Sequence, residues 1–140
     1  MQENVDLRIR TMRVIWIALF LTSGLYYAFA IVSKRPDDVE PNGTLFLVFV
    51  AIALSTTLIS FLIKSKLINR AVEQQQVQLV QQAYMVAWAM MEVAAFLGLI
   101  DFYLTGNRYF YVLFIISTVG LLLHFPQRDH VIHASFKRPF

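Results

Sequence analysis

The sequence predicts an all-α integral membrane protein with one domain of four transmembrane helices. Hydrophobic residues make up 58% of the 140 positions, and charged residues make up only 15%. A single soluble core of this size cannot bury so much apolar surface. The apolar residues fall into four long segments, residues 14–32, 45–63, 83–104 and 109–125. Each segment has, or nearly has, the length that a helix needs to cross about 30 Å of hydrocarbon.

These segments are expected to cross as helices, because an unpaired backbone amide in lipid is very costly. None of them shows the alternation of apolar and polar residues that a membrane β-barrel needs. The first, second and fourth segments contain no Asp, Glu, Lys or Arg. The first shares a basic flank and the small residues Ala28 and Ala30 with secretory signals, but we expect it to be a retained span.

The distribution of the 12 Lys and Arg residues predicts the orientation. Nine of them lie at the N-terminus, in the connection after the second span and in the C-terminal tail, whereas the other two connections hold three. The positive-inside rule then places both termini in the cytoplasm, with the spans forming two antiparallel hairpins. Residues 126–140 are predicted to be a basic cytoplasmic tail. Residues 70–82 lack Gly and Pro, so we expect helix there, with a disordered low-complexity tract as the alternative.

Composition also limits the partners. The net charge is +3, but the basic residues lie between apolar runs and form no continuous face, so nucleic acid is not an expected partner. The expected partners are the lipid bilayer and other membrane protein subunits, and a homo-oligomer is a further arrangement. We expect the bacterial inner membrane, with an organellar membrane as the alternative. The sequence contains no Cys, and we expect no cofactor.

Glu92 is the only charged residue placed deep inside a predicted span. It lies nine residues after Ala83, which is about 13.5 Å into a core of about 30 Å. Desolvation disfavours the ionised form there, so we expect a protonated carboxyl unless water, a cation or a hydrogen-bond donor reaches it. Such a group can bind and release a proton. The structural alternative is a neutral packing residue that is hydrogen-bonded to a neighbour.

Small residues form a stripe along the third span, and they predict where this helix packs. At about 100° per residue the stripe contains Ala83, Ala87, Ala94 and Gly98. The last two are separated by three residues, a spacing that permits close approach of another helix. Glu92 projects roughly opposite the stripe. If the stripe packs against the chain's own helices, we expect the carboxyl to point toward another subunit or lipid.

Hydroxyl side chains of the other three spans lie at the depth of Glu92. They are Thr22 and Ser23 in the first span, Ser55, Thr56 and Thr57 in the second, and Ser117 and Thr118 in the fourth. If Glu92 points inward, these hydroxyls can solvate its carboxyl. The candidates for this support are Ser55, Thr56, Ser117 and Thr118. The alternative is that each hydroxyl bonds back to its own helix, as Ser and Thr in membrane helices often do.

The remaining polar residues suggest no chemistry. Asp101 lies near the end of the third span, where we expect it to pair with Arg108 across a short loop. His130 and His133 share a helical face near Asp129, but no independently placed ligand completes a metal site, so no metal is expected. The sequence contains no glycine-rich phosphate loop, no zinc-protease motif and no nucleophile elbow. We therefore expect a protein that is not an enzyme and has no catalytic residue.

Residues 83–104, AYMVAWAMMEVAAFLGLIDFYL, resemble the carboxylate-bearing helix of the proteolipid (subunit c-like) family of rotary ATP synthases. The resemblance lies in the Ala-rich approach, the central Glu92, and the pair Gly98 and Leu99 that follows it. It covers only this helix. In that family the glutamate binds the transported proton or sodium ion, so the resemblance implies that Glu92 is an ion-binding position.

The sequence therefore predicts a small, non-enzymatic membrane subunit of a larger assembly. Its midplane carboxyl is expected to bind a proton or cation in the manner of a proteolipid. The alternative is a purely structural accessory subunit in which Glu92 has no ion-handling role. A small transporter is a weaker alternative, because the spans contain one deep charged site and show no sign of a broken helix.

Overall fold

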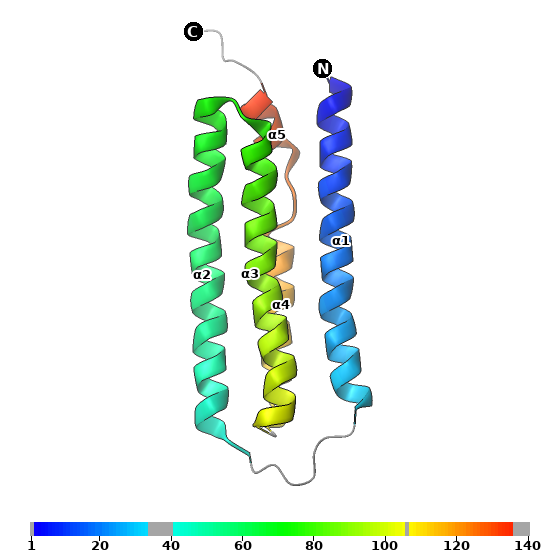
Figure 1. Cartoon of the computed structure of the whole chain (residues 1–140), viewed down its shortest axis with the longest axis vertical. Helices are drawn as coiled ribbons and strands as arrows, with labels where there is room; N and C mark the ends of the chain where they lie inside the picture. Colours follow the sequence, from blue (N-terminus) through cyan, green and yellow to red (C-terminus); the bar gives the residue numbers. More distant parts are fainter. Residues whose placement is uncertain (1, 34–40, 106, 136–140) are drawn as a thin grey trace.

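The computed structural model describes residues 2–33, 41–105 and 107–135, and all of its regular elements are α-helices (Figure 1). The helices are α1 (Gln2–Val32), α2 (Gly43–Gln74), α3 (Val77–Leu104), α4 (Tyr111–Leu123) and α5 (Arg128–Ser135). This confirms the all-α prediction. The first three helices are long and apolar enough to cross a membrane, and α4 with α5 adds a fourth crossing if this bent pair counts as one span. The chain is thus a multi-pass membrane protein.

The centre of the bundle is α3, which packs against all four other helices. In Figure 1 it lies between α2 and α1, with α4 behind it. Within the described residues α1 contacts α3, α4 and α5 but does not touch α2. The first two spans therefore do not form the packed hairpin that we expected from the sequence. The hairpin does not form because α3 offers packing surface on two sides and separates α1 from α2.

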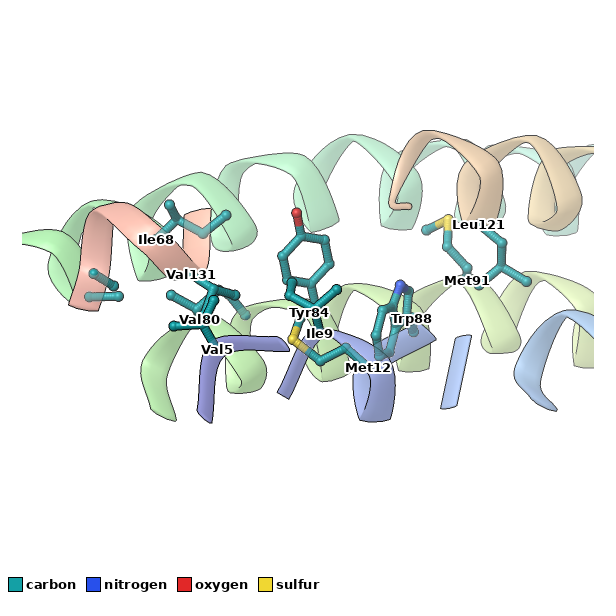
Figure 2. Close-up of a cluster of buried hydrophobic side chains, with 13 residues drawn as sticks. Val5, Ile9, Met12, Ile68, Val80, Tyr84, Trp88, Met91, Leu121 and Val131 are labelled. Atoms are coloured by element: carbon teal, nitrogen blue, oxygen red, sulfur yellow. The ribbon is translucent and has the colours of Figure 1, made fainter. Parts of the chain in front are cut away.

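The main hydrophobic core lies at the end of the bundle that holds the start of α1, the turn between α2 and α3, and α5. We call this the α5 end. Met12 of α1, Trp88 of α3 and Leu121 of α4 meet in this core (Figure 2). On α5, Val131 and Ala134 are fully buried. Residues 128–135, which were predicted to belong to a polar tail, thus form a helix that packs into the core, and residues 136–140 lie outside the described residues.

The small-residue stripe of α3 is buried along its whole length. At Gly98 the ring of Phe114 is so close that a methyl group added to this glycine would lie 2.8 Å from its Cε2 atom. Gly120 of α4 makes the reciprocal approach, because a methyl group there would overlap the sulfur of Met91. These close contacts bring α4 directly against α3.

The fourth apolar segment does not form one continuous span. The 13 residues of α4 extend only about 19.5 Å, which is short of a hydrocarbon core of about 30 Å. The helix ends at Leu123, and Pro126 prevents it from continuing because proline has no backbone N–H and disfavours helix at the residue before it. The axis of α5 is bent by 44° from that of α4.

Two indole groups complete the hydrogen bonds at this break. Trp16 donates from Nε1 to the carbonyl of Leu121 at 2.8 Å, and Trp88 donates from Nε1 to the carbonyl of His124 at 2.9 Å. The last carbonyls of a helix have no partner within the helix, and an apolar surrounding offers no water to replace one. The backbone N–H of His124 also bonds the carbonyl of Leu121, so Trp16 adds a second donor there and Trp88 supplies the donor for the carbonyl of His124.

Residues 70–82 are helical except at the turn between α2 and α3, so the helical interpretation holds and the disordered alternative does not. The turn consists of Gln75 and Gln76. Gln75 adopts a left-handed conformation with φ 54°, and its backbone N–H bonds the carbonyl of Ala71. This is the usual way to end a helix, although glycine is the usual residue for it. The break could not be predicted from the sequence because no Gly or Pro marks it.

The close approach at Gly98 predicts that Gly98→Ala destabilises the protein by about 1–3 kcal/mol, because the new methyl group overpacks against Phe114. Gly24→Ala is the matched control, since a methyl group at Gly24 meets no atom within 4 Å. Thermal unfolding in mild detergent measures both changes. Equal melting temperatures for the two variants would contradict this packing of α4 on α3.

The capping of α4 predicts that Trp88→Phe lowers the free energy of unfolding by about 1–3 kcal/mol beyond the loss of ring area, because the buried carbonyl of His124 loses its donor. Phe96→Leu, at an exposed aromatic residue of the same helix, is the control for the change in ring size. Denaturant titration of both variants in detergent gives the comparison. A Trp88→Phe variant as stable as the control variant would argue against the cap.

Candidate functional site

Glu92 lies near the middle of α3 and is half-buried. Its Oε1 atom accepts a hydrogen bond of 3.0 Å from the hydroxyl of Ser23 on α1. The carboxyl therefore points toward α1, although the small-residue stripe on the other side of α3 is also buried. Both occur because α3 is central: α2 and α4 pack against the stripe at Ala94 and Gly98, and α1 reaches Glu92 on the opposite side.

A third helix contributes through Ser117 of α4. Its hydroxyl oxygen lies 3.5 Å from that of Ser23, and both serines are buried. When Glu92 is ionised, Ser23 donates to it, so Ser117 is then the donor in the second contact. We call Glu92, Ser23 and Ser117 the carboxyl cluster. It joins the central parts of α1, α3 and α4 in a layer that is otherwise apolar.

The carboxyl cluster contains no positive charge. The one salt bridge among the described residues joins Arg128 to Asp6, far away at the α5 end. The second oxygen of Glu92, Oε2, has no hydrogen bond to any described residue and is not among the fully buried polar atoms. An ionised carboxylate in hydrocarbon needs more than one donor to offset its desolvation. This carboxyl can therefore accept a proton or a cation at its free oxygen.

The other predicted hydroxyls do not reach Glu92. Thr56 donates to the carbonyl of Ile52 at 2.7 Å, and Ser55 is exposed. Both belong to α2, which lies on the other side of α3. Thr118 is adjacent to Ser117 but makes no hydrogen bond to a described residue. Depth alone thus selected too many candidates, because it does not tell which side of α3 each helix covers.

Asp101 does not pair with Arg108, which corrects the expected ion pair. Asp101 is buried, and its Oδ1 accepts a 2.6 Å hydrogen bond from the hydroxyl of Thr105. Arg108 instead donates to the hydroxyl of Tyr109 at 2.6 Å, and its guanidinium lies over the same ring. The capping bond within the last turn of α3 brings Asp101 inward, away from the loop.

A second polar cluster lies at the α5 end, and it was not predicted from the sequence. Tyr84 is its centre: its hydroxyl lies 2.7 Å from Nδ1 of His130 and accepts a hydrogen bond from the backbone N–H of Gln127. Lys64 lies over the ring of Tyr84, at 5.1 Å from its centroid. The aromatic pair Tyr84 and Trp88 was a usable signal, because side chains four residues apart share one face of a helix.

His124 forms a separate buried contact next to this cluster. It lies 2.8 Å from the hydroxyl of Ser60 through Nε2, and its ring packs on Phe61. Among the described residues, no three His, Asp or Glu side chains converge in a way that could hold a metal ion. These groups fix α5 and the end of α4 to α2 and α3.

Comparison of the sequence with protein-family models found no match, and comparisons with curated proteins and with solved structures found none either.

The geometry of the carboxyl cluster predicts that Ser23→Ala destabilises the protein by about 0.6 kcal/mol, the average for hydrogen bonds between membrane helices, and by no more than the maximum of about 1.7 kcal/mol. Thr22→Ala is the control, because the hydroxyl of Thr22 bonds only to the carbonyl of Ala18 in its own helix. Unfolding in detergent is measured for each variant, for Glu92→Ala, and for Ser23→Ala combined with Glu92→Ala. A cost of Ser23→Ala that is unchanged when Glu92 is absent would show that the two side chains are not coupled.

Proposed function

We propose that this chain is a small, non-enzymatic membrane subunit that works within a larger membrane assembly and binds a proton or a cation at Glu92. The observation that carries the proposal is the carboxyl cluster. Glu92 receives one hydroxyl donor from Ser23, has no cationic partner among the described residues, and keeps one oxygen free. A carboxyl in this setting gains most from a proton or a cation that neutralises it.

The rival function is a purely structural accessory subunit, and the bond from Ser23 favours it in one respect, because that bond satisfies part of the carboxyl internally. A protonated carboxyl can also donate its own O–H to the hydroxyl of Ser23 at the same 3.0 Å. The feature that favours ion binding is the second oxygen, Oε2, which has no hydrogen bond to a described residue.

The proposed topology has four spans, with the bent pair of α4 and α5 counted as the fourth. The start of α1 and the whole of α5 lie at the same end of the bundle, where Arg128 bonds Asp6 (Figure 1). With the excess of Lys and Arg on that side, the positive-inside rule places this end in the cytoplasm. We propose the bacterial inner membrane as the location.

The resemblance of α3 to the proteolipid helix supports the same role for Glu92. It extends over this helix only, and the surroundings of the acid come from this chain's own α1 and α4. Large apolar side chains cover the outer faces of α1 and α2, among them Leu25 and Leu58. These faces are available to lipid, to other subunits of the assembly or to further copies of the chain.

Carbodiimide labelling tests the proposal directly, because this reagent modifies protonated carboxyls that are accessible from lipid. We expect modification at Glu92, with a rate that falls as the pH is raised, and no modification of Asp101, which is buried and bonded to Thr105. Peptide mapping by mass spectrometry distinguishes the two sites. Complete resistance of Glu92 at every pH would refute an accessible, protonatable carboxyl.

The matching variant is Glu92→Gln, which keeps an acceptor for Ser23 and removes the titratable group. We expect it to assemble with the parent complex and to abolish proton-coupled activity, whereas Glu92→Asp keeps part of that activity. If Glu92→Gln preserves both assembly and full coupling, the structural subunit is the correct function.

A further inference from the structure

A cavity of about 310 Å³ opens between α1 and α4 beside the carboxyl cluster. Ser23, Gly24 and Tyr27 line it from α1, and Tyr111, Phe114 and Thr118 are among the residues that line it from α4. Its volume is at the lower end of the range of about 300–1,000 Å³ for small-molecule sites. Ile115 and Val119, also in its wall, are exposed on the outer surface of the bundle, so the cavity opens sideways toward lipid.

Four hydroxyls belong to residues that line this cavity, and only that of Ser23 is bonded to described residues, Glu92 and Ser117. The hydroxyls of Tyr27, Tyr111 and Thr118 make no hydrogen bond to any described residue. Threonine in a membrane helix usually bonds back to its own backbone, as Thr22, Thr56 and Thr57 do in this chain. Thr118 departs from that pattern at the wall of the cavity, so its donor is available to a ligand.

The hydroxyls that line the cavity lie at two depths in the bundle. Tyr111 begins α4 and Tyr27 lies one turn beyond Ser23, so the two phenols lie toward the end of the bundle opposite α5. Ser23 and Thr118 lie deeper, at the level of Glu92. The ring of Phe114 is part of the wall and packs edge-on against Tyr27, with ring centroids 5.4 Å apart. Because Ser23 donates to Glu92, Thr118 is the free donor at the inner end, and the phenols of Tyr27 and Tyr111 are the donors at the outer end of this aromatic-walled slot.

We propose that this slot binds the ring of a membrane quinone. A quinone is neutral and flat, dissolves in lipid, and carries oxygen acceptors on opposite edges of its ring, which matches donors at both ends of a slot with aromatic walls. Its isoprenoid tail leaves through the lateral opening into the bilayer. The proposal concerns binding alone and goes beyond the ion-binding function, on which it does not depend.

Two other lipid-derived occupants fit less well. A phosphate headgroup needs a cation, and no Lys, Arg or His among the described residues lines the slot. An acyl chain needs no hydroxyl, and this protein has another hollow that suits an acyl chain better. A second hollow on the other side of α1, lined by residues such as Leu25, Phe29 and Leu99, has an almost wholly apolar wall. The hydroxyls therefore distinguish the slot from an ordinary lipid groove.

Photolabelling of the full chain in phosphatidylcholine nanodiscs tests the proposal, with an azidoquinone as the probe and decylubiquinone as the competitor. We expect crosslinks in residues 23–27 and 111–119 that decylubiquinone suppresses. Gly24→Leu fills the slot without meeting a neighbouring atom at its Cβ, so we expect labelling to fall at least tenfold. Gly43→Leu is the control, because a Cβ there also meets no atom within 4 Å and the residue does not line the slot.

A second variant removes one hydroxyl and keeps the shape of the slot. Thr118→Val is expected to weaken competition by decylubiquinone about fivefold, the effect of one lost hydrogen bond. The control is Thr56→Val, because the hydroxyl of Thr56 bonds to its own helix. In this variant decylubiquinone is expected to compete as strongly as in the wild type. Normal labelling of Gly24→Leu, or crosslinks that concentrate in the apolar hollow around Leu25 and Phe29, would overturn the proposal. Labelling of the Glu92→Gln variant separates the quinone proposal from the ion-binding function, because this variant is expected to keep quinone binding.

Discussion

The fold depends on one constraint: a helix that ends inside an apolar bundle must find donors for its last carbonyls. α4 ends too early to cross the membrane alone, and the indoles of Trp16 and Trp88 donate to the carbonyls of Leu121 and His124 at this end. Because the tryptophans come from α1 and α3, the same bonds hold these two helices to α4 at the α5 end. The break also lets α5 turn back into the core, where Val131 is fully buried.

The position of α3 explains the site. Its small-residue side admits α4 so closely that Gly98 touches Phe114, and this leaves the side that carries Glu92 to α1. An acid on the outer side of a two-helix hairpin would face lipid. Because a third helix covers it here, the acid instead meets a hydroxyl, and a second hydroxyl, that of Ser117, lies behind the first. The carboxyl cluster is therefore a consequence of bundle topology, more than of any motif in α3.

The sequence was sufficient to predict those features that depend on composition and on the length of the apolar segments. The all-α membrane class followed from the apolar runs, and the helix in residues 70–82 followed from the absence of Gly and Pro. The failures concern contacts between segments far apart in the chain. Hydropathy could not show that α1 avoids α2, nor that Asp101 bonds Thr105 instead of Arg108. Pro126 did indicate a break, but not that a helix beyond it would be buried.

The uneven packing of α1 connects the site with the slot. From Val5 to Phe20 this helix packs into the core at the α5 end, whereas beyond that point only Ser23 and Ala30 are buried. Cavities flank this second half on both sides, one toward α4 and one toward α3. Few contacts therefore oppose displacement of this half of α1, and local stability falls with the number of buried contacts. Ser23 lies where the tightly packed half ends, so the donor to Glu92 belongs to the loosely packed half of α1, whereas Trp16 bonds the inner half to α4.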